Sequence, residues 1–433
     1  MSAFAAETNQ SPYSIDLPTA LRLAGAQNLD VALARERLAE ARAQHESTRL
    51  QFFPWLSPGI IYRRHDGNTQ STEGDIVDVN KQSYAPGVTL AALWDLGEAL
   101  YERLVAKQLA QAADHALEAQ RQDATLSAAQ AYFDLALAQA SVGVAQEALN
   151  ISSNYEAQVQ HAVAAGIAFK GDLLRVQVQT ERNRLALRQA AEQQRLAAAR
   201  LAQTLHLDPI VELLARETDL APISLVDPNA TLAALVAQAL GARPELKQGQ
   251  ALAAAARDAR NGAVYGPWIP SVGVQVFGGG LGGGKHDDWG NFGDQQDYLL
   301  GLGWRIGPGG LFDKPRQRAA ESRFNAAQLT LDKLRDEITR QVVDANTHHR
   351  SLADQLDYAR QALATAQEGL RLAEARKEFA VGVVLETIQA QQDLTRTRLD
   401  YLQTVAALNV AQYATIKALG APPSTSSPSS SPR

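Results

Sequence analysis

The chain of 433 residues repeats itself about halfway, and this duplication limits its possible folds more than any other feature. The landmarks are short segments that return in the same order. They are FPWLSP (53–58) and GPWIPS (266–271), WDLG (94–97) and WRIG (304–307), AGIA (165–168) and VGVV (381–384), and LHLDP (205–209) and LGAPP (419–423). Both halves are therefore expected to fold into the same series of elements.

Each half predicts one helix, two short strands around a polar loop, and two long helices joined at a glycine turn. Repeat 1 (16–207) gives a helix at 16–51, strands at 57–66 and 83–94, and long helices at 97–163 and 171–206. Repeat 2 (230–421) gives a helix at 230–264, strands at 269–278 and 297–305, and long helices at 312–380 and 385–419. The rest is an N-terminal segment (1–15), a proline-containing connector (208–229) and a Ser- and Pro-rich tail (422–433) that we expect to be disordered.

The long helices carry apolar side chains at spacings of three and four residues, which is typical of coiled coils. At 1.5 Å per residue, the helix predicted over 97–163 would be about 100 Å long. A compact domain does not need helices of that length. The helices are therefore expected to bridge a large distance.

Composition excludes several classes of function. The chain has no cysteine, and its 47 acidic and 41 basic residues show no sustained basic run, so disulfides, thiolate metal sites and nucleic-acid binding are not expected. No apolar run is long enough to predict a membrane-spanning helix. The first 14 residues lack the pattern of a signal peptide, so for an exported protein we expect the signal to lie outside this sequence.

No motif predicts an enzyme, a cofactor or a metal site. The run from Gly279 to His286 resembles a phosphate-binding loop, but His286 stands where a Ser or Thr is needed and no helix start follows. A surface loop is the favoured interpretation. His348 and His349 are adjacent in a helix and so do not form the i, i+4 pair of a zinc site.

The predicted strands alternate apolar residues with small or polar ones, as in Val272, Val274 and Val276. A sheet packed on a protein core and a membrane-embedded sheet both fit this pattern. The long polar loops at 66–82 and 279–296 favour the membrane, as do aromatic residues near the strand ends. These aromatic residues, the candidates for a membrane interface, are Tyr62, Trp94, Tyr298 and Trp304. Four strands cannot close a barrel alone, so copies of the chain must pool them.

The two glycine turns are the other candidate site. Gly166 and Gly382 are expected to end helices, which explains the glycines. Their neighbours are nevertheless apolar at what should be exposed tips, which indicates a docking surface. The candidate docking residues are Ala165, Gly166, Ile167, Ala168, Val381, Gly382, Val383 and Val384.

Taken in order, these landmarks resemble the TolC family of outer-membrane efflux proteins over about residues 14–421. The resemblance implies a mainly α fold with a small β-barrel part, in which a homotrimer forms a 12-stranded outer-membrane β-barrel continued by a periplasmic α-helical barrel. Residues 208–229 would belong to an equatorial region. The implied partners are outer-membrane lipid, a periplasmic adaptor protein that meets the tips, and an inner-membrane pump.

The resemblance also implies a periplasmic gate of inward-facing polar side chains just after each turn. The matching residues are Asp172, Glu386, Gln389 and Asp393. We therefore expect a passive export duct in the outer membrane that is not an enzyme and needs no cofactor. The alternative that the sequence leaves open is a soluble coiled-coil scaffold or adaptor protein without a pore.

Overall fold

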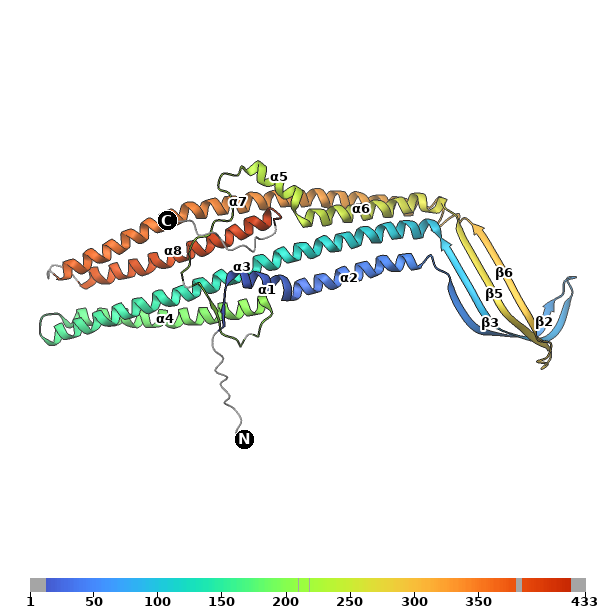
Figure 1. The fold of residues 1–433 in the computed structure, drawn as a ribbon, viewed down its shortest axis with the longest axis horizontal. Coiled ribbons are helices and arrows are strands. Elements are labelled where there is room, and N and C mark those ends of the chain that lie inside the picture. The colour runs from blue at the N-terminus through green and yellow to red at the C-terminus, as the bar shows by residue number, and fades with distance from the viewer. Residues whose placement is uncertain (1–12, 209, 218, 379–383, 422–433) are drawn as a thin grey trace, which may run out of the picture. The chain divides into compact units, whose positions relative to one another are not determined.

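The computed structural model describes residues 13–208, 210–217, 219–378 and 384–421 (Figure 1). The predicted disordered tail and most of the second glycine turn lie outside these residues. The elements of the first half are β1 (Tyr13–Ile15), α1 (Leu17–Gln27), α2 (Leu29–Leu50), β2 (Trp55–Gln70), β3 (Ile76–Asp95), α3 (Leu96–Ala164), α4 (Lys170–Leu205) and β4 (Leu213–Ala215). Those of the second half are α5 (Leu232–Ala242), α6 (Pro244–Tyr265), η1 (Gly266–Trp268), β5 (Ser271–Lys285), β6 (Gly293–Gly303), α7 (Lys314–Glu378) and α8 (Val384–Ala418).

The predicted duplication is confirmed, because the order of two helices, two strands and two long helices occurs twice. The chain divides into two compact units, and each takes segments from both halves. Unit 1 comprises Met1–Glu36, His115–Leu246 and Leu334–Arg433, and unit 2 comprises Arg37–Asp114 and Lys247–Lys333. Each unit is described by itself below.

The first helix of each half is broken in two, where the sequence predicted one continuous helix. At 16–51 the break is Asn28, whose backbone is extended and whose side-chain Oδ1 accepts the N–H groups of Asp30 and Val31 at 2.9 and 3.3 Å. Such capping begins a new helix. In the second half the break is Arg243, because the ring of Pro244 disfavours helical backbone at the residue before it.

Unit 1 is built around the buried faces of α1, α3 and α4. Leu135 of α3 and Leu201 and Leu205 of α4 are fully buried in one apolar cluster. Burying each such side chain stabilises the fold by about 1.5–3 kcal/mol. The strands β1 and β4 form a short parallel pair beside this cluster.

Amide side chains hold the extended connector to the long helices of unit 1. Asn409 of α8 accepts the N–H of Ile223 and donates to the carbonyl of Ala221, each at 2.9 Å. On α3, Gln139 accepts the N–H of Ala215 at 3.1 Å and donates to its carbonyl at 3.3 Å. These backbone groups of the connector are thus paired by side chains of the long helices.

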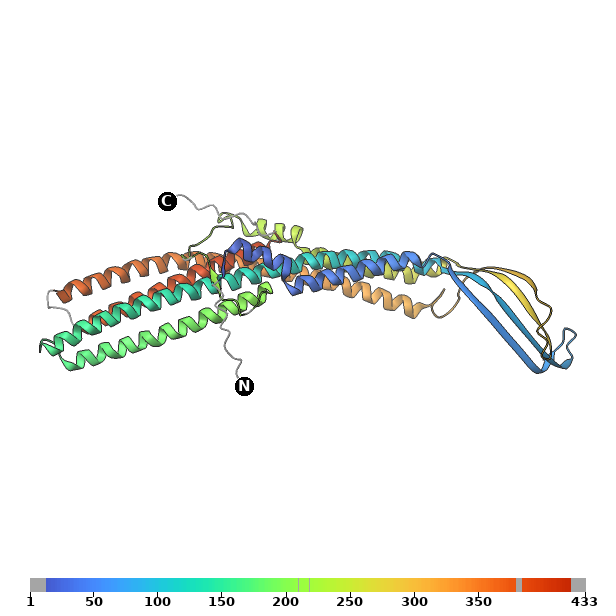
Figure 2. The ribbon, with the colours of Figure 1, turned by 60° about the horizontal axis from the view of Figure 1, so that its bottom comes forward.

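Unit 2 contains a four-stranded antiparallel sheet in the order β2-β3-β5-β6. Its strands are longer than predicted, and the loops expected at 66–82 and 279–296 shrink to 71–75 and 286–292. The polar and glycine-rich ends pair as regular strands, although their composition is typical of loops. Figure 2 shows the β2–β3 hairpin running past the ends of β5 and β6.

Candidate functional site

The sheet of unit 2 has two chemically different faces. Leu56 of β2 lies opposite Leu90 of β3, and Leu90 lies opposite Val276 of β5. Because side chains alternate along each strand, the apolar residues in this register share one face. We call this the apolar face. It comprises Leu56, Pro58, Ile60, Pro86, Val88, Leu90, Ala92, Val272, Val274, Val276, Leu300 and Leu302.

Most of the large side chains of the apolar face are exposed, whereas its β5 valines are half-buried and Ala92 is buried. Leu300 is 78% exposed, Ile60 73% and Leu302 64%. A soluble protein rarely leaves so continuous an apolar surface in water. The arrangement therefore disfavours the soluble scaffold that the sequence left open.

The opposite face, which we call the polar face, carries mostly small or polar side chains. A few larger apolar residues interrupt it, among them Ile61, Phe277 and Leu299. Its small and polar members are Ser57, Gly59, Arg63, Ser83, Thr89, Ala91, Gly273, Gln275 and Gly301. Such a face suits contact with water.

Aromatic side chains cluster beyond one end of the apolar face. The loop 286–292 folds back so that the ring of Trp289 stacks on Tyr62 and lies against Tyr84, both with ring centroids at 5.6 Å, and Phe292 stacks on Tyr84 at 6.0 Å. The Tyr84 hydroxyl donates to the carbonyl of Trp289 at 2.9 Å. Of these four residues the sequence singled out only Tyr62.

The glycines of β5 make room for these rings. A Cβ atom on Gly282 would lie 2.4 Å from Cζ of Tyr84, and one on Gly280 would lie 2.1 Å from Cζ of Phe292. The glycine run that resembled a phosphate-binding loop is therefore strand rather than the expected surface loop, and no helix follows Lys285.

A second aromatic group lies at the other end of the sheet. Trp94 donates its Nε1–H to the carbonyl of Phe52 at 3.1 Å, and Trp304 donates to the carbonyl of Trp268 at 3.2 Å. Both indole rings thus present an apolar body and a satisfied polar edge, which suits a boundary between lipid and water. Tyr298, also predicted for the interface, lies opposite Val276 between the two groups and is 74% exposed.

The first glycine turn connects α3 to α4 in unit 1. Gly166 has a positive φ of 75°, and the N–H of Ile167 bonds the carbonyl of Ala162 at 2.8 Å, which closes the helix in a Schellman motif. Ala165 is exposed and Ala168 half-buried. Ile167 and Phe169 are each 82% exposed. The sequence missed Phe169, although an aromatic residue directly after the turn was a usable signal.

Most of the second turn is not described. Val381, Gly382 and Val383 lie outside the described residues, and Val384 begins α8. The Val384 side chain is half-buried against a cluster that contains Tyr155. Its apolar surface therefore faces other helices of unit 1 more than the solvent.

Two of the four predicted gate residues are neutralised by arginines. Asp172 pairs with Arg175 at 3.2 Å, and Glu386 pairs with Arg376 at 2.6 Å. Gln389 and Asp393 lie one and two turns along α8 and are exposed. Within the described part of the chain, the Asp393 carboxylate forms no ion pair.

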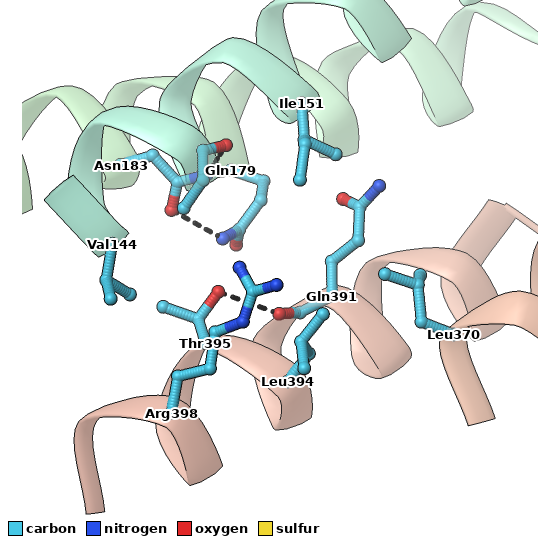
Figure 3. Close-up of a pocket in the computed structure, with 10 residues that line it drawn as sticks. Val144, Ile151, Gln179, Asn183, Leu370, Gln391, Leu394, Thr395 and Arg398 are labelled. Atoms are coloured by element: carbon cyan, nitrogen blue, oxygen red, sulfur yellow. Dashed lines mark hydrogen bonds between the residues drawn. The ribbon is translucent and has the colours of Figure 1, made fainter. Parts of the chain in front are cut away.

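Polar contacts join the two helical hairpins of unit 1 near these residues. Gln392 of α8 donates to Gln179 of α4 at 2.6 Å, and Arg398 of α8 pairs with Glu147 of α3 at 2.7 Å. Figure 3 shows Gln179, Asn183 and Arg398 around a cavity of about 20 Å³, room for about one water molecule. Asn183 extends the network by donating to Ser152 of α3 at 2.9 Å.

A larger cavity, about 650 Å³, lies among α2, α3, α6 and α7 in unit 2. Its lining combines alanines with charged groups, including the ion pair of Glu98 and Arg316 at 3.0 Å. Burial raises the pKa of Glu102 in this cavity, and the neighbouring Glu98 and Asp95 raise it further. The described residues hold no cluster of metal ligands. In the same residues, none of the helices combines the length and the apolar character required to cross a membrane.

Comparison with known proteins agrees with this geometry. A sequence model of the outer membrane efflux protein family matches the chain twice, at residues 20–205 and 235–421. Protein CyaE of Bordetella pertussis is 33% identical over 170 residues, which are 39% of this chain. The chain aligns with 35% of CyaE, about a third of the length of that relative.

The fold is also similar to those of solved outer-membrane channels. For CmeC of Campylobacter jejuni the TM-score is 0.80 at 15% identity, over 97% of this chain and 90% of CmeC. For MtrE of Neisseria gonorrhoeae it is 0.77 at 18% identity, over 97% of this chain and 96% of MtrE. The predicted resemblance is confirmed. The chain belongs to the outer membrane efflux protein family, whose members are non-enzymatic channels of the bacterial outer membrane with a large periplasmic helical part.

Proposed function

We propose that three copies of the chain form a passive duct through the outer membrane. The family implies a trimeric channel within a tripartite system. The observation that carries the proposal for this chain is the exposed apolar face between two aromatic groups. From Tyr84 to Trp94 the strand advances about 33 Å, and at a tilt of about 40° this covers roughly 25 Å of depth, the height of the apolar band of an outer-membrane sheet.

The sheet order supports closure between copies. The edge strands β2 and β6 both have one unpaired side, and successive strands alternate in direction. The β6 strand of one copy would therefore lie antiparallel to β2 of the next. Three four-stranded sheets exceed the roughly eight strands that closure requires, and the polar face would then line the interior.

The first hairpin tip is the proposed docking point for a periplasmic adaptor protein. Ile167 and Phe169 place two large apolar side chains in solvent at the end of a rigid hairpin. Threefold repetition would give a ring of such contacts. An inner-membrane pump would supply the energy, since the duct itself carries out no reaction.

The proposed gate lies just behind the tips. Asp393 would contribute the uncompensated charge, because Asp172 and Glu386 are paired with arginines. A threefold ring of carboxylates at a constriction favours cations. Opening would require the polar contacts between the two hairpins to separate.

Two neighbouring leucines of β6 offer a sharp test of the membrane assignment. Leu300 and Leu299 are 78% and 66% exposed but lie on the apolar and the polar face, respectively. An arginine at Leu300 should destabilise membrane insertion by about 2–4 kcal/mol per copy, whereas an arginine at Leu299 should leave insertion intact. Heat-resistant trimers would be counted after refolding into lipid vesicles.

Equal insertion of Leu300→Arg and Leu299→Arg would contradict the proposal. So would a wild-type protein that stays monodisperse in buffer without detergent, which is the behaviour expected of a soluble scaffold.

A further inference from the structure

Three basic side chains form one row across the polar face of the sheet. His65 of β2 lies opposite Lys81 of β3, and Lys81 lies opposite Lys285 of β5. Arg63 lies on the same face, two residues before His65. We call these four residues the basic row.

This arrangement is unfavourable unless an anion offsets it. Like charges directly opposite each other on neighbouring strands repel, since their Cβ atoms are only about 5 Å apart. Within the described residues, none of Arg63, Lys81 and Lys285 forms an ion pair. The contrast is Arg64 on the opposite face, which pairs with Asp287 at 3.2 Å and with Asp66 at 3.9 Å.

The carboxylates at this end of the sheet do not neutralise the row. Asp66 and Asp78 alternate onto the opposite face, and Asp75 lies six residues from Lys81, about 20 Å along an extended strand. Asp297 on the polar face lies opposite Phe277, about 26 Å from Lys285 along β5; it lines another cavity together with Arg63 but forms no ion pair with it in the described residues. At physiological salt, charges separated by much more than about 8 Å are largely screened from each other.

An open cavity and a histidine nitrogen without a hydrogen-bond partner lie beside the charged side chains. Lys81, Ser83 and Lys285 line an open cavity of about 620 Å³. Asp288 also lines it, but its carboxylate lies beside Gly284, which alternates onto the face opposite the basic row, and within the described residues it forms no ion pair with Lys81 or Lys285. The Nε2 atom of His65 is shielded from water and has no hydrogen-bond partner in the described structure.

We propose that the basic row is a binding site for oxoanions, such as phosphate or carboxylate groups, at the outer mouth of the duct. The proposal rests on the proposed function, because closure of the sheet would turn the polar face inward and place three basic rows around one opening. Each lysine supplies three donors, and Arg63 can hold two oxygens of one anion. Because the donors are exposed, the site would be weak and sensitive to salt, which suits a group that binds and leaves in transit.

Along the strands, Tyr62 and Tyr84 lie between the helices and the basic row. The site should therefore be reached from one side of the membrane only. The test uses the full chain in planar lipid bilayers. Conductance is measured as inorganic tripolyphosphate is added to either side. The same titration with citrate tests carboxylate groups. We expect block from one side at low millimolar anion and near-complete relief of block in 1 M salt.

The double variant Lys81→Gln/Lys285→Gln removes two charges per copy. Losing two exposed charge contacts should raise the half-blocking concentration about fivefold. The matched control is Arg64→Gln, which removes a charge from the same end of the sheet on the other face and should leave the block unchanged. The half-blocking concentration of the variant is divided by that of the wild type for each anion. A larger ratio for tripolyphosphate than for citrate would identify phosphate as the preferred group, and the reverse would identify carboxylate.

Equal block of the wild type and the double variant would overturn the inference, as would equal block from both sides or loss of block in Arg64→Gln. A protein that forms no pores would instead refute the proposed duct. Pores that conduct without any block by the anions would refute the basic row alone.

Discussion

The contacts between the two hairpins of unit 1 allow a quantitative prediction about opening. The double variant Gln392→Leu/Arg398→Met removes the hydrogen bond to Gln179 and the ion pair with Glu147. A hydrogen bond between neutral side chains contributes about 1 kcal/mol and a half-exposed ion pair about 0.5 kcal/mol. The closed arrangement should therefore lose about 1.5 kcal/mol per copy.

The size of the effect depends on whether the three copies open together. If they open independently, the open-to-closed ratio of each should rise about tenfold, since 1.4 kcal/mol corresponds to a factor of ten. If they open in one concerted step, about 4.5 kcal/mol is lost at once and the ratio rises roughly a thousandfold. Single-channel recording separates the two cases by open probability and by the presence or absence of partial conductance levels.

A neighbouring glutamine serves as the control. Gln391 lines the same cavity, but its side chain takes part in none of the described hydrogen bonds; its backbone carbonyl accepts the hydroxyl of Thr395 (Figure 3). Gln391→Leu should leave the open probability unchanged. An unchanged open probability in the double variant, or an equal rise in the control, would refute the reasoning.

Three further predictions follow from other contacts. Arg243→Met leaves Glu245 without the bidentate partner that lowers its pKa despite burial, so unfolding in detergent should become easier by about 3 kcal/mol at neutral pH. The pKa of Glu245 is lower in the folded than in the unfolded protein, so its ion pair with Arg243 stabilises the fold above about pH 4.5. This stabilisation is lost as the pH falls through the folded pKa, where the stabilities of variant and wild type should converge. Gly282→Ala forces a Cβ against the ring of Tyr84, so it should lower the free energy of unfolding by about 1–3 kcal/mol and alter the near-ultraviolet circular dichroism. Gly278→Ala, whose Cβ would meet no atom within 4 Å, should change neither. Asp393→Asn should reduce the cation preference, measured as a reversal potential in a salt gradient, more than removal of either arginine-paired acid.

The long helices could be predicted because their pattern is local. Apolar spacing in the sequence gives α3 as 97–163, and the structure has Leu96–Ala164. The break at Asn28 escaped prediction, because leucine and alanine continue at helical spacing on both sides of it. Only the capping geometry shows that a new helix begins there.

The sheet and the gate show what a local pattern misses. The glycine run of β5 looks like a loop until the rings of Tyr84 and Phe292 are seen to lie against it, and the packing of Tyr84 joins segments about 200 residues apart. The pairing of Glu386 with Arg376 likewise depends on how α7 and α8 come together. The first contact joins distant segments; the second joins residues only ten apart, but it forms between the end of α7 and the start of α8, where helical spacing gives no signal.

The two open edges of the sheet have a consequence for inheritance as well as for assembly. If β6 of each copy completes the β2 edge of the next, every subunit contributes one edge to each of two junctions, and one subunit with a damaged edge opens one of the three junctions and so the whole ring. In a cell that makes defective and normal chains in equal amounts, random mixing would leave only about one trimer in eight without a defective copy. A mutation at either edge should therefore be dominant over the normal gene, whereas a mutation at a docking tip, which leaves the junctions intact, should be tolerated in a mixed trimer.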